Sequence, residues 1–160
     1  MANDDGMISK IEGYFVTLLR ALEHESKKVF RDDEKSVDHW KHQLAATSGG
    51  LEAFERYAPF AFVSYMETDS AREGGNDLRQ VPILAVLIGV TNKEPGVARL
   101  GDENTLGASK IRDLVIDLLD TNQPAAIACD EIYYAGDIIT VETEKHFAIQ
   151  LKFELSFMKE

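Results

Sequence analysis

The sequence has one cysteine, one tryptophan and four prolines among 160 residues. Because Cys129 has no second cysteine to pair with, an internal disulfide is excluded, and a lone cysteine is typical of a small buried side chain. No apolar run approaches the ~20 residues that a membrane-spanning helix needs. The longest run, Val81 to Val90, is interrupted by Pro82 and Gly89. The acidic start MANDDG is no signal peptide, and we expect residues 1–6 to form a flexible lead.

Positive charge is scarce, with 17 lysines and arginines against 28 acidic residues and a formal net charge of −11. Such a chain repels nucleic acid and anionic membrane surfaces. The composition therefore argues against tight DNA wrapping, RNA binding and a polybasic membrane contact. It leaves open a surface past which DNA slides without sticking.

The length and the 44% apolar content are typical of one globular domain. Apolar residues at spacings of three and four predict a helix over residues 8–28. Ser36 predicts the cap of a second helix carrying His39 and Trp40. Residues 51–57 are compatible with another helical turn or two, which Pro59 ends.

For the rest of the chain, the pattern predicts mainly strands. Strands are predicted over residues 60–66, 81–91, 127–134, 138–143 and 147–158, with a helix from Asn104 or Thr105 to about Thr121. In the last strand apolar residues alternate with polar ones, so one face is buried. The strand over 81–91 is apolar on both faces, which indicates a central position. We expect the strands over 127–134 and 138–143 to pair across residues 135–137.

These elements predict a single α+β domain over residues 1–160. Adjacent strands without crossover helices favour antiparallel pairing. We therefore expect one mostly antiparallel sheet of about four to five strands, with two or three helices packed on one face.

Catalytic signals are weak. His39 and His42 would share a face of the expected second helix and could grip a metal, with His24 as a third ligand. No HExxH motif, matching cysteine or diagnostic carboxylate spacing accompanies them, so solvated histidines are the favoured interpretation. The many carboxylates are better explained as a solvated acidic surface, and the glycine pairs match no phosphate-binding pattern. We expect no enzyme, no cofactor and no metal.

Two long polar segments, 68–77 and 92–103, flank the strand over 81–91. Loops beyond a compact sheet are natural interaction arms, although ordinary disorder explains them equally well. The long last strand could also extend a sheet between subunits if it lies at an edge. The charged candidates for contacts are Glu67, Asp69, Arg72, Glu73, Asp77, Arg79, Lys93, Glu94, Arg99, Asp102 and Glu103.

Several phrases in order resemble the Mu-like prophage tail proteins of the tail-terminator type. They are the opening helix from Met7 to Glu12, the phrase YAPFAFVSY over 57–65, the strand over 83–90, the phrase LGASKIRDL over 106–114, and the strand FAIQLKF over 147–153. Each phrase is unspecific by itself; their order and spacing across nearly the whole chain carry the resemblance. Residues 36–50 fit the family pattern less well.

The resemblance implies an α+β virion subunit that forms a ring, expected to be a hexamer, in some cases only on its template. The ring would cap the tail tube, stop its polymerisation and join the tail to the head connector, with DNA passing through the lumen. The implied partners are other copies, the tail tube protein and the connector protein. The implied location is the virion tail, with assembly in the host cytoplasm. The alternatives are a neck or head-completion protein and, from another class, a small metal-dependent hydrolase.

Overall fold

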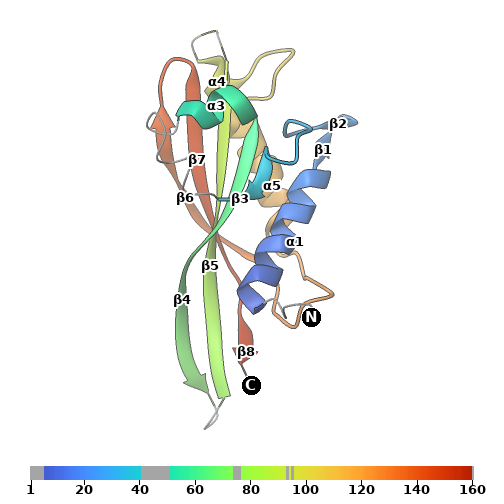
Figure 1. Cartoon of the computed structure of the whole chain (residues 1–160), viewed down its shortest axis with the longest axis vertical. Coiled ribbons are helices and arrows are strands. Elements are labelled where there is room, and N and C mark those ends of the chain that lie inside the picture. The colour runs from blue at the N-terminus through green and yellow to red at the C-terminus, as the bar shows by residue number, and fades with distance from the viewer. Residues whose placement is uncertain (1–5, 41–50, 74–76, 93, 95, 160) are drawn as a thin grey trace.

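The computed structural model describes residues 6–40, 51–73, 77–92, 94 and 96–159, and its centre is a six-stranded sheet (Figure 1). The strands are β3 (Val37–His39), β4 (Phe60–Glu73), β5 (Asp77–Thr91), β6 (Tyr133–Glu142), β7 (His146–Glu154) and β8 (Phe157–Lys159). Their order is β3-β4-β5-β7-β6, and β8 pairs with the beginning of β5. Among the strands of the described residues, only the β3–β4 pair is parallel. The α+β class is therefore confirmed, whereas four to five antiparallel strands match this mixed sheet only roughly.

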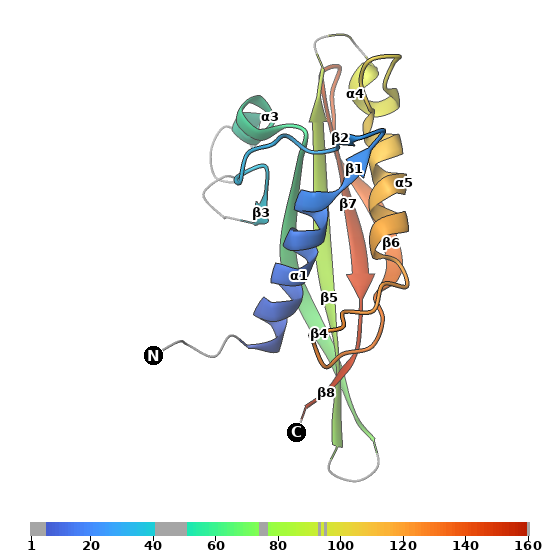
Figure 2. The same cartoon turned by 90° about the vertical axis from the view of Figure 1, so that its right-hand side faces the viewer.

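Four helices accompany the sheet in the described ranges: α1 (Met7–Ala21), α3 (Leu51–Tyr57), α4 (Val97–Leu100) and α5 (Ala108–Leu119). Helices α1 and α5 lie side by side on one face of the sheet (Figure 2). Their apolar stripes bury Ile11, Phe15, Ile111 and Val115 in the main core. None of the helices in the described part of the chain is long and apolar enough to cross a membrane.

The expected packing of two or three helices on one face fits α1 and α5, and the opposite face of the sheet carries the additional helix α3. Alternate side chains of a strand point to opposite faces. On β4, Ala61 and Val63 join the main core under α1, while Phe60 and Phe62 form a second cluster. Phe54 of α3 packs on this second cluster, with its ring centroid 5.3 Å from that of Phe60.

The alternation predicted at the C-terminus is confirmed, but its place in the sheet is not. The apolar set is buried throughout: Phe147, Ile149, Leu151, Phe153, Leu155 and Phe157. The strand breaks at Leu155 and Ser156 into β7 and β8. Because β7 pairs with β5 on one side and β6 on the other, it is interior and offers no edge.

The first helix is shorter than predicted, and the predicted start of the second helix at Ser36 is wrong. After Ala21 the chain forms a small hairpin of β1 (Glu23–His24) and β2 (Lys27–Lys28), whose turn residues Glu25 and Ser26 have φ of 52° and 66°. Ser36 is fully buried and donates a hydrogen bond to the Tyr57 carbonyl (2.8 Å), so it caps no helix. The next residues form β3, and residues 41–50 lie outside the described ranges.

The hairpin predicted over 127–143 is also wrong. One strand, β6, runs through residues 135–137 and pairs with β7. Its register shifts twice, next to Ala135 and Thr140, and the first shift adjoins Gly136 at φ +114°. Isolated glycine in a strand pattern fits such a bulge as well as a turn.

The predicted cap of the third helix is wrong in a similar way. Helix α5 begins at Ala108. Its N-cap residue is Gly107, so no side chain caps the helix. A Cβ on Gly107 would lie 2.3 Å from the Gly101 nitrogen, so the close contact of the two backbone segments requires glycine. Asn104 and Thr105 instead belong to the turn before the helix.

Candidate assembly surfaces

The first group of predicted contact residues lies on strands, where the sequence predicted a loop. Strands β4 and β5 continue past the end of β7 as a two-stranded projection, which we name the arm (residues 68–73 and 77–82). Figure 1 shows it extending beyond the other strands. Glu67 stands at its base, and Asp69, Arg72, Glu73, Asp77 and Arg79 lie along it. Strand β8 supports only the β5 side of the arm, over residues 78–80.

The second group lies around α4. Asp102 accepts hydrogen bonds from the Thr105 hydroxyl (2.7 Å) and the Asn104 amide (2.9 Å), and these lower the pKa of its carboxyl. Arg99 contacts Glu142 at 3.4 Å and lies over the Phe147 ring. Glu94 and Glu103 are exposed, and Lys93 lies outside the described residues. The 92–103 segment is therefore partly helical, with polar contacts of its own.

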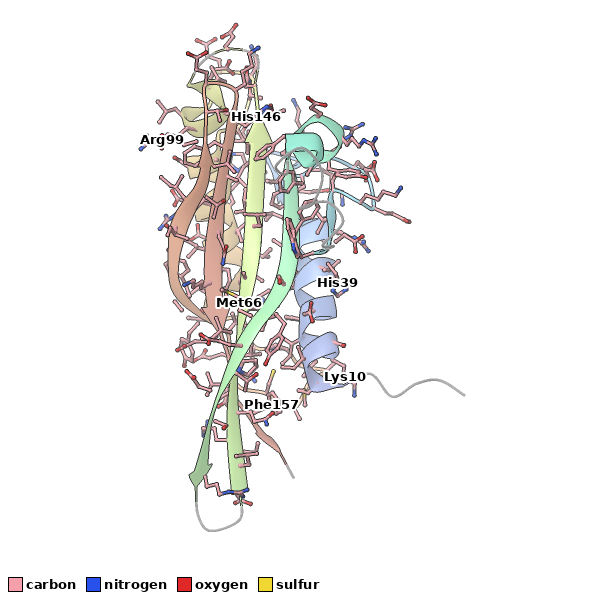
Figure 3. The ribbon with its side chains drawn as sticks, turned by 60° about the vertical axis from the view of Figure 1, so that its left-hand side comes forward. Lys10, His39, Met66, Arg99, His146 and Phe157 are labelled. Carbon is pink, nitrogen blue, oxygen red and sulfur yellow. The ribbon has the colours of Figure 1, made fainter. Side chains whose placement is uncertain are left out.

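The two groups lie at opposite ends of the molecule. Strand β5 runs from Asp77 at the arm to Thr91 beside the α4 region. Its fifteen residues span roughly 50 Å at the rise of an antiparallel strand. Figure 3 places Arg99 at one end of the molecule, well away from Met66 near the base of the arm. The two predicted segments therefore form two separate surfaces.

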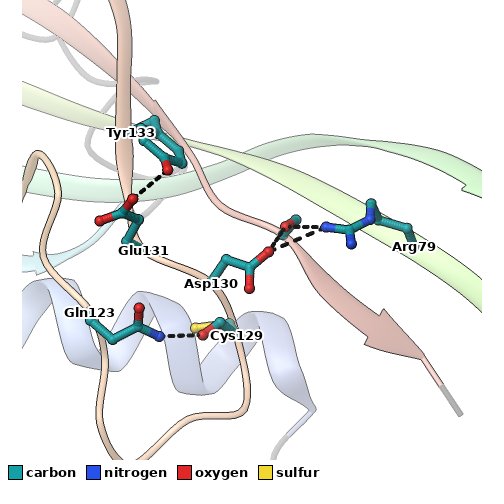
Figure 4. A network of polar contacts seen from close by, with 7 residues as sticks. Arg79, Gln123, Cys129, Asp130, Glu131 and Tyr133 are labelled. Atoms are coloured by element: carbon teal, nitrogen blue, oxygen red, sulfur yellow. Dashed lines mark hydrogen bonds and ion pairs between the residues drawn. The ribbon is translucent and has the colours of Figure 1, made fainter.

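A polar cluster anchors the arm to the body. Arg79 of β5 donates to Asp130 (3.2 Å) and to the Ser156 hydroxyl (2.9 Å), and Ser156 donates to Asp130 at 2.5 Å (Figure 4). These contacts lower the pKa of Asp130, the Ser156 hydrogen bond most of all. Three chain regions thus meet in this cluster: the arm, the segment before β6, and the link between β7 and β8. Arg79, predicted as a contact residue, has an intramolecular role.

A second cluster fixes β6 to α5. Arg112 donates to Asp137 at 2.7 Å and to the Tyr134 hydroxyl at 3.1 Å, and it also pairs with Asp113. The Asp137 hydrogen bond raises the pKa of Arg112, while burial and Asp137 raise that of Tyr134. The planar guanidinium suits this several-fold contact. It holds β6 at its first register shift.

Strand β6 carries a feature that our sequence interpretation missed. Ile138 and Ile139 are 58% and 44% exposed, and Tyr133 is 46% exposed. Adjacent residues of a strand point to opposite faces, so a neighbouring isoleucine pair in one strand places apolar surface on both faces. The isoleucine pair was visible in the sequence. Because we wrongly predicted a turn at residues 135–137, we did not recognise it as part of a long exposed strand.

The helix face that would have brought His39 and His42 together as metal ligands is not present at His39. His39 lies on strand β3 and pairs with Glu12 at 3.3 Å, so it shares no helix face with another histidine. His42 lies outside the described residues. His24 neighbours Glu25, and His146 contacts the Thr91 hydroxyl at 2.6 Å. Within the described ranges, no three His, Cys, Asp or Glu residues are grouped to hold a metal ion.

One hollow of about 350 Å³ opens between the β1–β2 hairpin and the turn before α5. Cations line one side, with Lys27 and Lys28, and carboxylates the other, with Asp102 and Glu103. The Lys28 ammonium already donates to the Arg20 carbonyl at 2.9 Å. Lys28 and Asp102 therefore stabilise local structure, and the two separate end surfaces remain the better candidates for function.

Comparisons with known proteins add no relative. A scan against models of known protein families finds no match, and a search of curated proteins finds no similar sequence.

Proposed function

We propose that this chain is a virion structural protein of the phage tail-terminator type. In this role its copies form a ring that caps the tail tube, stops tube polymerisation and joins the tail to the head connector. The proposal draws its family from the ordered resemblance in the sequence. Its partners are further copies, the tube protein and the connector protein.

The observation that carries the proposal is the two-ended layout of the subunit. A terminator must meet the tube on one side and the connector on the other. Here the charged arm and the α4 region lie at opposite ends of β5. Subunits arranged around an axis roughly along their strands would gather the arms on one side of the ring and the α4 regions on the other.

The first test images the purified protein by negative-stain microscopy, with and without tail tube protein, after light scattering across a concentration series. We expect rings alone or on tube ends, and tubes that stop growing when the protein is added. Tubes that grow to the same length with bare ends would contradict the proposal. Rings bound to isolated connector but never to tube would favour the neck or head-completion alternative.

Two matched variants separate the ends. Asp77→Lys changes an exposed carboxylate on the β5 side of the arm, and Glu94→Lys changes one beside α4. Each reversal should weaken binding to one partner and spare the other, as measured by sedimentation with tube protein and with connector protein. If both variants lost the same partner, the assignment of one end to each partner would be wrong.

A further inference from the structure

The sheet has two open edges of similar length. Among the residues that the structure describes, strand β6 is an edge over residues 135–142, because the Tyr134 amide at its beginning already donates to the Asp120 carboxylate at 2.9 Å. On the other side, β3 pairs only with residues 61–63 of β4, and the Trp40 amide adds one bond to the Val63 carbonyl. In the described part of the chain, no strand pairs with the outer edge of β4 over the ten residues 64–73. Open edges are templates for pairing with another strand.

The directions of the two edges are compatible. Each step from β4 to β5, β7 and β6 is antiparallel, so β4 and β6 run in opposite directions. A second copy placed beside the first without being turned over would bring its β4 antiparallel to β6. Such a contact is heterologous, and repetition of a heterologous contact gives a closed ring or a filament.

We infer that copies of this chain join head to tail, with β6 of one copy pairing antiparallel to residues 64–73 of β4 in the next. The inference deepens the proposed function, on which it rests, by naming the surfaces that build the ring. The occupant of each edge is a second copy of this same chain.

The exposed apolar residues of the two edges match face by face. On the face that carries α3, Ile138 lies opposite Gln150, and the Gln150 amide contacts the Met66 sulfur at 3.4 Å. On the face that carries α1 and α5, Ile139 lies opposite Ile149, and Tyr65 lies opposite Leu84. Each edge therefore offers at least one exposed apolar side chain to each face of the junction, and Tyr133 of β6 adds a second on the face of Ile138.

The charges of the two edges also avoid direct conflict. Asp137 and Glu142 of β6 lie opposite Leu151 and Phe147, on the α1 and α5 face. Glu67 and Asp69 of β4 lie opposite Ile83 and Val81, on the other face. Like charges directly opposite across a strand pair destabilise it, and this arrangement separates them. Arg72, opposite Leu78, lies on the same face as the β6 carboxylates.

The junction requires one copy to be displaced along its strands. The paired positions Tyr133, Glu154, Ile83 and Glu67 place β6 level with the first half of β4, where β3 already pairs. To meet residues 64–73, β6 must lie further toward the arm of the next copy. A cumulative stagger of this kind is what a closed sheet of tilted strands requires.

The test is disulfide trapping in full-length protein with Cys129→Ser. One preparation carries Ile138→Cys, and a second set carries one cysteine at each position from 64 to 73. Equal mixtures are oxidised gently, with and without tail tube protein, and mixed products are counted by mass spectrometry. Because disulfides need Cβ atoms about 4 Å apart, we expect several-fold higher yields at alternate positions on one face only.

Leu100→Cys is the matched control, since Leu100 is 73% exposed on α4 and belongs to neither edge. The inference is overturned if the crosslink yields match this control under both conditions or show no alternation along β4. It is also overturned if Ile138→Cys self-dimers exceed the mixed products, because that would indicate two-fold pairing of β6 with β6. Tube-bound rings without these crosslinks would contradict the strand junction and still support the terminator function. Crosslinks without any tube binding would support the strand junction and contradict the terminator function.

A pair of charge variants provides a second readout. Ile138→Lys places a charge on the exposed edge, and Leu100→Lys places one on a more exposed site outside it. Both should fold, because neither side chain is buried. Light scattering and microscopy should show ring formation lost only in Ile138→Lys; retained rings in that variant would overturn the inference.

Discussion

Two glycines of this chain have opposite surroundings. A Cβ on Gly89 of β5 would lie 2.1 Å from the ring of Phe60, which is buried in the second cluster, whereas one on Gly13 of α1 meets nothing within 4 Å. We expect Gly89→Ala to destabilise the fold by about 1–3 kcal/mol through overpacking. We expect Gly13→Ala to stabilise it by about 0.5–1 kcal/mol, because glycine is costly in a helix. Urea unfolding compares both variants; equal effects would contradict the packing of Phe60 against β5.

The Asp130 carboxyl gives a prediction for pH. Its pKa is lowered first by the Ser156 hydrogen bond and then by Arg79. A carboxyl with a lowered folded pKa stabilises above its unfolded value of about 3.9, and that contribution is lost as the pH falls through the folded pKa. In Ser156→Ala the pKa of Asp130 should rise toward its ordinary value, as read by carboxyl chemical shifts in an NMR titration. An unchanged titration would show that Arg79 alone sets it.

Single residues differed in how far the sequence determined them. The alternating set from Phe147 to Phe157 was predictable, because a long period-two pattern has one solution that buries it. Ser36 was not, since serine before a polar stretch suits a helix cap and a buried tertiary hydrogen bond alike. Among the contact candidates, nothing local to Arg79 indicates its partners Asp130 and Ser156, which are distant in sequence.

At the scale of elements, one side chain makes several hydrogen bonds between α5 and β6. Arg112 joins them through Asp137 and Tyr134. Arg112→Ala should reduce stability by roughly 1 kcal/mol, since its charged hydrogen bonds are partly solvent-screened. It should also speed amide hydrogen exchange over residues 134–139. Lys110→Ala, an exposed position on the same helix, is the control; equal protection in both variants would contradict the anchoring role.

Helices and strands with a long apolar periodicity were predicted correctly. The predictions failed where pairing with another segment determines the conformation. The helix α1 and the strands β4, β5 and β7 were placed correctly at their cores, because their apolar patterns repeat several times. The arm was missed, since polar residues 68–73 are in strand conformation only by pairing with β5. Strand β6 was split because Gly136 marks a bulge there, and a bulge and a turn leave similar signals in sequence.

At the scale of the molecule, the net charge of −11 repeats in every copy of the proposed ring. Repelled DNA would not adhere to a lumen lined with carboxylates, which suits its passage. A lumen lined with lysine and arginine, seen in a map of the ring, would contradict that role for the acidic residues. The same charge opposes assembly, because each added copy brings like charge to the ring.

The opposition between like-charged copies predicts how assembly responds to salt. The proposed junction joins apolar residues such as Ile138 and Met66, whose burial does not weaken with salt. Salt screens the repulsion, since the Debye length falls from about 14 Å to about 4 Å between roughly 0.05 M and 0.5 M. Ring formation should therefore shift to lower protein concentration as salt is added, as measured by light scattering in sodium chloride. Sodium sulfate would add to this shift by strengthening apolar burial. Rings that dissociate as salt rises would instead show that opposite charges, such as Arg72 against the carboxylates of β6, dominate the contact.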